Sequence, residues 1–214
     1  MRELNIPVTT HGRVLIDEGP SAPPLRLLAG CHGYAQSADE MMEMLEEIPC
    51  AGWTRVSIQA LHRFYRGRSE TTVASWMTRQ DRESLIADNL AYVEAAIAAA
   101  AGGRPIARLV FCGFSQGVAM AFRAAALGAR PADAVFALGG DVPPELVVSG
   151  ARSCPRVLLA RGSQDAWYAD EKMRDDEARL LERGATVETL TFDGAHEWHA
   201  DVAAAAGRIL STLG

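Results

Sequence analysis

Residues 108–129 read RLVFCGFSQGVAMAFRAAALGA. An apolar run ends at Gly113, Ser115 follows, and an alanine-rich segment begins after Gly117. The apolar run is typical of a buried strand and the alanine-rich segment of a helix. A serine between two glycines at a strand-to-helix turn matches G-x-S-x-G, which exposes a nucleophile above a sheet. An ordinary tight turn with a capping serine gives the same pattern, so the rest of the chain must decide between the two.

Around this segment, strand-like and helix-like runs alternate along the chain. Strands are expected at residues 12–19, 25–31, 54–61, 106–113, 133–140, 155–162 and 186–194, the last near a sheet edge. Helices are expected at residues 37–48, 81–102, 117–129, 169–185 and 199–213, and residues 62–80 look irregular. The alternation predicts an α/β fold with a mostly parallel central sheet and helices on both faces. Sites in such sheets lie at the carboxyl ends of the strands, which filters the candidate residues.

Length and composition favour one domain over residues 1–214. The net charge of −6 argues against nucleic acid as a partner, because phosphate binding needs clustered positive charge. The N-terminal MRELNIPVTTHGR lacks the apolar core of a signal peptide, and AYVEAAIAAAAGG, interrupted by Glu94, is too short for a transmembrane segment. We therefore expect a cytoplasmic protein; whether it forms a homodimer stays open.

The four cysteines are Cys31, Cys50, Cys112 and Cys154, and they lack the spacing of a metal site. Cys31 and Cys112 end apolar runs, which indicates buried free thiols. Neither a metal ion nor a cofactor is expected.

A serine hydroxyl becomes a good nucleophile only when a base takes its proton. His196 follows the last expected strand, in the loop FDGAHEW, and so lies at the sheet edge where Ser115 needs a base. It also fits the order serine, acid, histidine of α/β-hydrolases. His199 lies about one helical turn further on and is expected to face solvent or to cap the last helix. The spacing HEWH is not H-E-x-x-H, so no zinc site is indicated.

The acid that orients the histidine should follow a strand between Ser115 and His196. Asp133 precedes its strand, and Asp193 is too close to His196 in the chain. Asp165 is preferred because GSQD places it a short turn after a strongly apolar strand. Asp141, which follows VFALGG one strand earlier, is the alternative.

Hydrolysis through a tetrahedral intermediate also needs N–H donors for the developing oxyanion. One donor is the backbone N–H after the nucleophile, which belongs to Gln116. The other comes from the turn after an early strand, where LLAGCHGYAQS offers the Tyr34 N–H. His32 in this turn is expected to form structural hydrogen bonds.

Taken together, these pieces resemble the phospholipase/carboxylesterase family of α/β-hydrolases, which includes acyl-protein thioesterases and small bacterial carboxylesterases. The resemblance runs through LAGCHGYAQSADEM, SWMTRQDRESLIADNLAYVEAAI, VFCGFSQGVAMAF, ALGGDVPPEL, VLLARGSQDAWY and FDGAHEWHAD, nearly the whole chain. It implies that Ser115, Asp165 and His196 form a catalytic triad. It also implies that Tyr34 and Gln116 are the oxyanion donors. It also favours Asp165 over Asp141.

The chain departs from the family pattern at three places. Ala35 stands where a second glycine often follows the oxyanion residue, and Val118 stands where another glycine often follows GFSQG. The segment ALHRFYRGRSETTVASW, residues 60–76, differs from the usual proline- and glycine-rich substrate loop. This last departure leaves the substrate open.

The substrate pocket is expected to lie under residues 62–80, which follow a strand's carboxyl end. Aromatic side chains suit an acyl or aryl group, and the candidates are Phe64, Tyr65, Trp76 and, past the acid, Trp167. The arginines of the same stretch could attract a carboxylate or phosphate, but we favour a solvated loop. Short connections elsewhere leave no room for a large cap domain.

The favoured function is a serine hydrolase of carboxylic esters or thioesters that acts through an acyl-enzyme intermediate. Its expected partner is a small-molecule ester or thioester. One alternative is an amide or peptide hydrolase of the same fold. Another is a non-catalytic binding protein on this fold, against which the intact Ser115, Asp165 and His196 argue.

Overall fold

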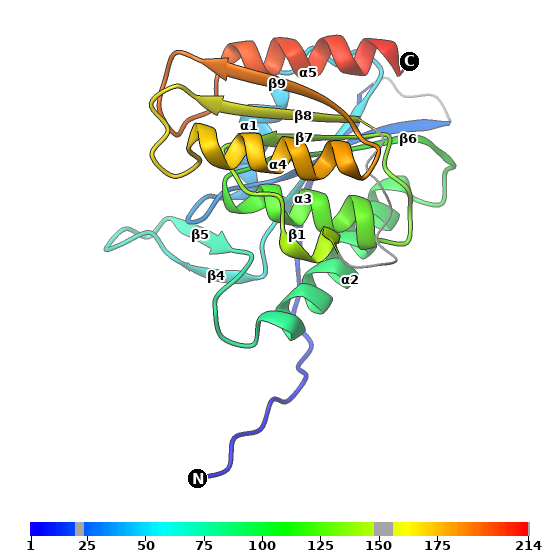
Figure 1. Cartoon of the computed structure of the whole chain (residues 1–214). Helices are drawn as coiled ribbons and strands as arrows, with labels where there is room; N and C mark the ends of the chain where they lie inside the picture. The colour runs from blue at the N-terminus through cyan, green and yellow to red at the C-terminus, as the bar shows by residue number, and fades with distance from the viewer. Residues whose placement is uncertain (20–23, 148–155, 214) are drawn as a thin grey trace.

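A computed structural model describes residues 1–19, 24–147 and 156–213 of the chain. In chain order, its strands are β1 Arg13–Asp17, β2 Leu25–Cys31, β3 Thr54–Gln59, β4 His62–Tyr65, β5 Thr72–Ser75, β6 Ile106–Phe114, β7 Ala134–Leu138, β8 Arg156–Gly162 and β9 Thr186–Phe192. Its helices are α1 Ala38–Glu46, α2 Arg82–Ala101, α3 Gln116–Leu127, α4 Asp170–Glu182 and α5 Ala200–Thr212, with a 3₁₀ turn at Pro144–Val147. Figure 1 shows these elements as a layered body, from which the N-terminal segment extends away.

Seven strands form the central sheet in the order β1-β3-β2-β6-β7-β8-β9. All neighbours pair in parallel except β1, which runs antiparallel to β3 at one edge. The prediction that residues 186–194 lie near an edge is confirmed, because β9 is the other edge strand. Parallel pairing brings the carboxyl ends of five strands to the same edge of the sheet, namely β2, β6, β7, β8 and β9.

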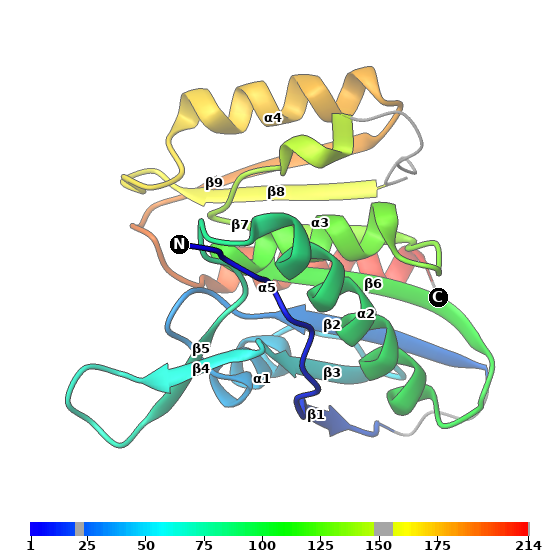
Figure 2. The same ribbon diagram turned by 90° about the horizontal axis from the view of Figure 1, so that it is seen from below.

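Helices cover both faces of this sheet (Figures 1 and 2). On one face, α1 and α5 bury Met41, Leu45, Val202 and Ile209 against the sheet. On the other face, α2, α3 and α4 bury Val93, Ala121, Phe122, Met173 and Leu180. The predicted fold class is therefore confirmed, and the described residues include no large cap domain.

The stretch expected to be irregular, residues 62–80, contains a β-hairpin instead. His62–Tyr65 pairs antiparallel with Thr72–Ser75, as a two-stranded sheet of its own. The reversal passes through Gly67, whose φ of +57° is a left-handed conformation that favours glycine. Figures 1 and 2 both show the hairpin projecting from the body.

The structure also tests the expectations for the cap of α1, for the apolar helix α2 and for the cysteines. Ser37 caps α1, and its hydroxyl accepts from the Glu40 N–H while Glu40 accepts from the Ser37 N–H. Helix α2 is long and apolar enough by composition to cross a membrane, but its buried side chains belong to the core that it shares with α3. The predicted buried free thiols are confirmed for Cys31 and Cys112, while Cys154 lies outside the described residues.

Candidate active site

Ser115 occupies a strained turn between β6 and α3. Its φ of +51° and ψ of −118° lie outside the conformations common for serine. The turn requires close backbone approach: a Cβ on Gly117 would lie 1.9 Å from the Cys31 carbonyl oxygen, and one on Gly113 would lie 2.6 Å from the Gly117 carbonyl oxygen. Only glycine fits at these two positions. The Ser115 N–H donates to the Leu138 carbonyl at 2.8 Å, which ties the turn to β7.

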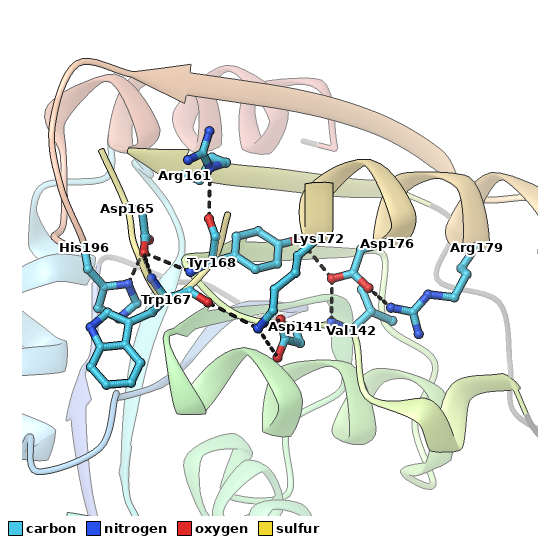
Figure 3. Close-up of polar contacts among 10 residues, drawn as sticks. All are labelled: Asp141, Val142, Arg161, Asp165, Trp167, Tyr168, Lys172, Asp176, Arg179 and His196. Carbon is cyan, nitrogen blue, oxygen red and sulfur yellow. Dashed lines mark hydrogen bonds and ion pairs between the residues drawn. The ribbon is translucent and has the colours of Figure 1, made fainter. Parts of the chain in front are cut away.

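His196 reaches Ser115 from the loop after β9. Its Nε2 lies 2.8 Å from the Ser115 Oγ, and its Nδ1 lies 2.8 Å from an Asp165 carboxylate oxygen. Asp165 comes from the loop after β8, the neighbouring strand, so parallel pairing brings the two loops together. Figure 3 shows the imidazole facing the carboxylate. Three side chains far apart in sequence thus form one hydrogen-bonded row.

The Asp165 side chain is 1% exposed and is held by the backbone that follows it. Its Oδ1 accepts from the Trp167 N–H at 2.8 Å and from the Tyr168 N–H at 2.9 Å, which leaves Oδ2 for His196. Burial by itself raises the pKa of Asp165, but the hydrogen bonds from Tyr168, His196 and Trp167 outweigh it and hold the pKa below its ordinary value. The carboxylate is therefore ionised and can stabilise a positive charge on the imidazole.

The alternative acid, Asp141, does not contact His196. Its side chain is 59% exposed and pairs with the Lys172 ammonium at 3.3 Å (Figure 3). His199 caps α5, where its ring accepts from the Asp201 N–H.

His32 is fully buried, and its ring forms hydrogen bonds to the backbone rather than to Ser115. Its Nε2 accepts from the Ala60 N–H at 2.9 Å, so its Nδ1 donates to the Gly33 carbonyl at 2.7 Å. Burial lowers the pKa of His32, in agreement with a neutral ring.

The two expected oxyanion donors belong to backbone segments next to Ser115. Gln116 opens α3 directly after the serine, and a Cβ on Gly33, next to Tyr34, would lie 3.3 Å from the Ser115 Cβ. Among the described residues, neither the Tyr34 nor the Gln116 backbone N–H donates to an acceptor. Tyr34 is 62% exposed and its ring makes a tilted contact with the Phe64 ring, so any part that Tyr34 plays in the oxyanion hole belongs to its backbone.

The Gln116 side chain, which sequence reasoning passed over, holds the end of the hairpin. Its amide oxygen accepts from the Trp76 N–H at 2.8 Å, and its amide nitrogen donates to the Met77 carbonyl at 3.0 Å and to the Ser75 hydroxyl at 3.1 Å. The residue after the serine therefore also fixes the segment that borders the site. A polar side chain next to a nucleophile was the only signal in the sequence.

A cleft of about 530 Å³ opens beside Ser115. Its lining comes from α3, the turn after β7, the loop after β8, the segment after β5 and the first turns of α2 and α4, and includes Met77, Gln116, Ala119, Gly140, Trp167 and Tyr168. Of the four expected substrate contacts, Trp167 lies in this lining. The structure does not bring Phe64, Tyr65 or Trp76 to it: Tyr65 is exposed on the hairpin, and Trp76 is fully buried with its indole N–H on the His32 carbonyl.

In the described part of the chain, no group of three or more His, Cys, Asp or Glu side chains could hold a metal ion.

The sequence profile of the phospholipase/carboxylesterase family matches residues 18–201. A search of curated protein sequences gives no significant match.

Similar solved structures include acyl-protein thioesterase 2 from Zea mays, with a TM-score of 0.73, 18% identity, and 95% of this chain and 100% of that chain covered. A carboxylesterase from Bacillus cereus has a TM-score of 0.73 and 12% identity, with 95% of each chain covered. A phospholipase/carboxylesterase from Dyadobacter fermentans has a TM-score of 0.73 and 19% identity, with 97% of this chain and 100% of that chain covered. At these identities the likeness concerns the fold.

Proposed function

The chain belongs to the phospholipase/carboxylesterase family, and from that premise we propose that it cleaves carboxylic esters or thioesters with a Ser115–His196–Asp165 triad. The observation that carries the proposal is the continuous row from the Ser115 Oγ through both imidazole nitrogens to the Asp165 carboxylate, with 2.8 Å at each step. Distances of this size allow proton transfer from a hydroxyl to a histidine base. The catalytic unit would be a single domain in the cytoplasm.

In the first half of the reaction, His196 Nε2 takes the proton of Ser115 as the Oγ attacks the carbonyl carbon. Asp165 accepts a hydrogen bond from the Nδ1–H of His196. This bond keeps the ring in the tautomer whose Nε2 can accept a proton, and the carboxylate stabilises the imidazolium. The oxyanion of the tetrahedral intermediate would accept from the Tyr34 and Gln116 N–H groups. When the intermediate collapses, His196 gives its proton to the leaving alcohol or thiol, and the acyl group stays on Ser115.

In the second half, a water molecule replaces the leaving group. His196 takes a proton from the water as its oxygen attacks the acyl-enzyme, and a second tetrahedral intermediate forms. Collapse returns the proton to Ser115 and frees the carboxylic acid. The open cleft next to the serine would admit both the substrate and the water.

The test compares the wild-type protein with Ser115→Ala, and with Ser211→Ala as a matched control on the exposed end of α5. We expect a fluorophosphonate probe to label the wild type and the control but not Ser115→Ala. Hydrolysis of short 4-nitrophenyl esters should fall roughly 10⁴-fold or more in Ser115→Ala. Labelling or turnover that survives in this variant would refute the proposal, and faster cleavage of a matched 4-nitroanilide would assign an amidase instead.

A further inference from the structure

The cleft beside Ser115 has a charge opposite to that of the chain. The chain carries a formal net charge of −6. The cleft lining nevertheless contains four basic side chains, Arg79, Arg82, Arg123 and Lys172, against one acidic side chain, Asp141. An acidic protein that concentrates positive charge next to its nucleophile needs a specific explanation, because local charge in a cleft selects the charge of its ligand.

Arg123 is the most unusual member of this cluster. Its side chain is 4% exposed, on the face of α3 that also carries Gln116 and Ala119 into the cleft. Among the residues that the structure describes, its Nε has no hydrogen-bond partner, and its Nη1 has only the Met120 sulfur, at 3.9 Å. Its Nη2 lies 3.4 Å from the nearer Glu145 oxygen, a long contact for an ion pair. A buried guanidinium with so few acceptors is incompletely satisfied.

Glu145 cannot neutralise the cluster by itself. Its carboxylate is shared, because Arg82 from the first turn of α2 also pairs with it, and more closely than Arg123 does. Burial lowers the pKa of Arg123, the charge of Glu145 raises it, and the nearby Arg82 lowers it again, so that the pKa lies below its ordinary value. One carboxylate facing two guanidinium groups leaves a positive charge that an anion would offset.

Lys172, from α4, also lines the cleft. Its ammonium is 3.3 Å from Asp141 and donates to the Trp167 carbonyl at 3.2 Å, and Figure 3 shows it extending from α4 toward these partners. The lysine side chain is 52% exposed, so its flexible stem can swing toward a ligand.

The distance from the nucleophile to the basic cluster suits a short spacer. Arg123 follows Ser115 by eight residues, which corresponds to about 12 Å along a helix, and helical side chains lean back toward the N-terminus. Apolar atoms of Met77 and Ala119 also line the cleft. A chain of several methylene groups would fit such a path.

We propose that the cleft contains an anion subsite in which Arg123 and Arg82, together with Lys172, hold a carboxylate or phosphate at the far end of the ester substrate. The proposal rests on the ester hydrolysis proposed above and names its substrate class: esters whose acyl chain ends in an anion several carbons from the scissile carbonyl. Arg123, pre-positioned by burial, would give a charge-assisted hydrogen bond that a neutral chain end cannot accept.

The test uses pairs of esters that differ only at the chain end. Mono-4-nitrophenyl adipate is compared with 4-nitrophenyl hexanoate, and the suberate monoester with the octanoate ester. We expect kcat/KM to favour the anionic ester by about tenfold in at least one pair. 4-Nitrophenyl 5-phosphonopentanoate, which has the same spacer as the adipate, separates the two sources of charge: a larger preference for it assigns phosphate, a smaller one carboxylate.

Variants separate recognition from stability. Arg82→Gln and Lys172→Gln change partly exposed side chains, and Arg123→Met removes the buried charge but keeps much of the apolar volume. Each should lower the ratio of the two kcat/KM values, Arg123→Met by about tenfold. A purely structural role would lower both values together and leave the ratio unchanged. Arg156→Gln, at the opposite end of β8 from the site, is the matched control and should change neither value.

Calorimetry with Ser115→Ala, comparing monoethyl adipate with ethyl hexanoate, makes the two proposals separable. Equal cleavage of each ester pair through Ser115, without preferential binding, would overturn the subsite and leave the hydrolase standing. Preferential binding of monoethyl adipate without any turnover would keep the subsite and refute the hydrolase. Absence of both turnover and preferential binding would overturn both.

Discussion

At the scale of single residues, two backbone hydrogen bonds occupy one carboxylate oxygen of Asp165 and leave the other oxygen for His196. In Asp165→Asn, the amide oxygen would keep the two backbone hydrogen bonds, and the amide nitrogen would face His196 Nδ1. The ring would then carry its proton on Nε2 and could not accept the proton of Ser115. We expect kcat for a 4-nitrophenyl ester to fall about 10⁴-fold with the fold retained. Asp141→Asn, the matched control, should cost far less; equal losses would contradict the role of Asp165.

The same carboxylate predicts a pH dependence of stability. The folded pKa of Asp165 lies below its ordinary value of 3.8, so the native state favours the ionised form. This contribution is complete above the unfolded pKa and is lost as the pH falls through the folded pKa. The free energy of unfolding should therefore fall more steeply for the wild type than for Asp165→Asn below about pH 4. Urea denaturation at several pH values measures this difference; parallel curves would contradict it.

The positions of Ser115, Asp165 and His196 could be predicted because their chemistry requires one order along the chain and one edge of the sheet. The structure brings the three within hydrogen-bond distance. The place of Arg123 could not be predicted, since an arginine in an alanine-rich helix looks the same in sequence whether it faces solvent or a cleft. Its burial depends on α2 and the 3₁₀ turn, which pack against α3.

At the scale of elements, the contact between α3 and β2 sets the height of the serine above the sheet. Gly117→Ala would place a methyl group 1.9 Å from the Cys31 carbonyl oxygen, and backbone atoms cannot give way as a flexible side chain can. We expect a loss of about 3 kcal/mol in unfolding free energy or more, together with reduced activity. Gly103→Ala, where a Cβ meets open space at a φ of +80°, should cost only about 1 kcal/mol. Thermal unfolding distinguishes the two, and similar shifts would refute the close-contact argument.

The link between α3 and the hairpin gives a second prediction at this scale. Gln116→Ala keeps the backbone N–H but removes the side-chain bonds to Ser75, Trp76 and Met77. Hydrogen exchange at the Trp76 amide should accelerate about tenfold, because its acceptor is lost. Esterase kcat/KM should fall by a similar factor as Met77 loses its fixed place at the cleft. Gln164→Ala, a control on an exposed loop, should change neither quantity. Unchanged exchange at Trp76 would contradict the link.

The hairpin itself shows where strand prediction failed. His62–Tyr65 is mostly exposed and carries no alternation of apolar and polar residues, the signal on which strand prediction relies. A better signal was Gly67 between this run and the β-branched residues of Thr72–Ser75. Periodicity did work for the buried parallel strands, whose apolar runs are nearly continuous.

At the scale of the whole molecule, two charge distributions act in opposite directions on an anionic substrate. The chain as a whole, at −6, repels an anion, whereas the basic cluster in the cleft attracts it. Repulsion comes from charges spread over the surface and acts at long range. Attraction comes from side chains that a bound anion would touch, in surroundings where water screens them less. The contact interactions should therefore dominate the specificity for the bound ester.

Ionic strength decides between these two effects. If the cluster dominates, the ratio of kcat/KM for the adipate monoester to that for the hexanoate ester should fall by a few fold as salt rises from ~0.01 M to ~0.5 M, because screening weakens its attraction. In Arg123→Met the fall with salt should be smaller, since one of the charges that attract the anion is removed while Arg82 and Lys172 remain in the cleft. The hexanoate ester, measured in parallel, corrects for general effects of salt on the enzyme. A wild-type ratio that rises with salt would mean that the net charge of the molecule outweighs the cleft, and the anion subsite would lose its electrostatic basis.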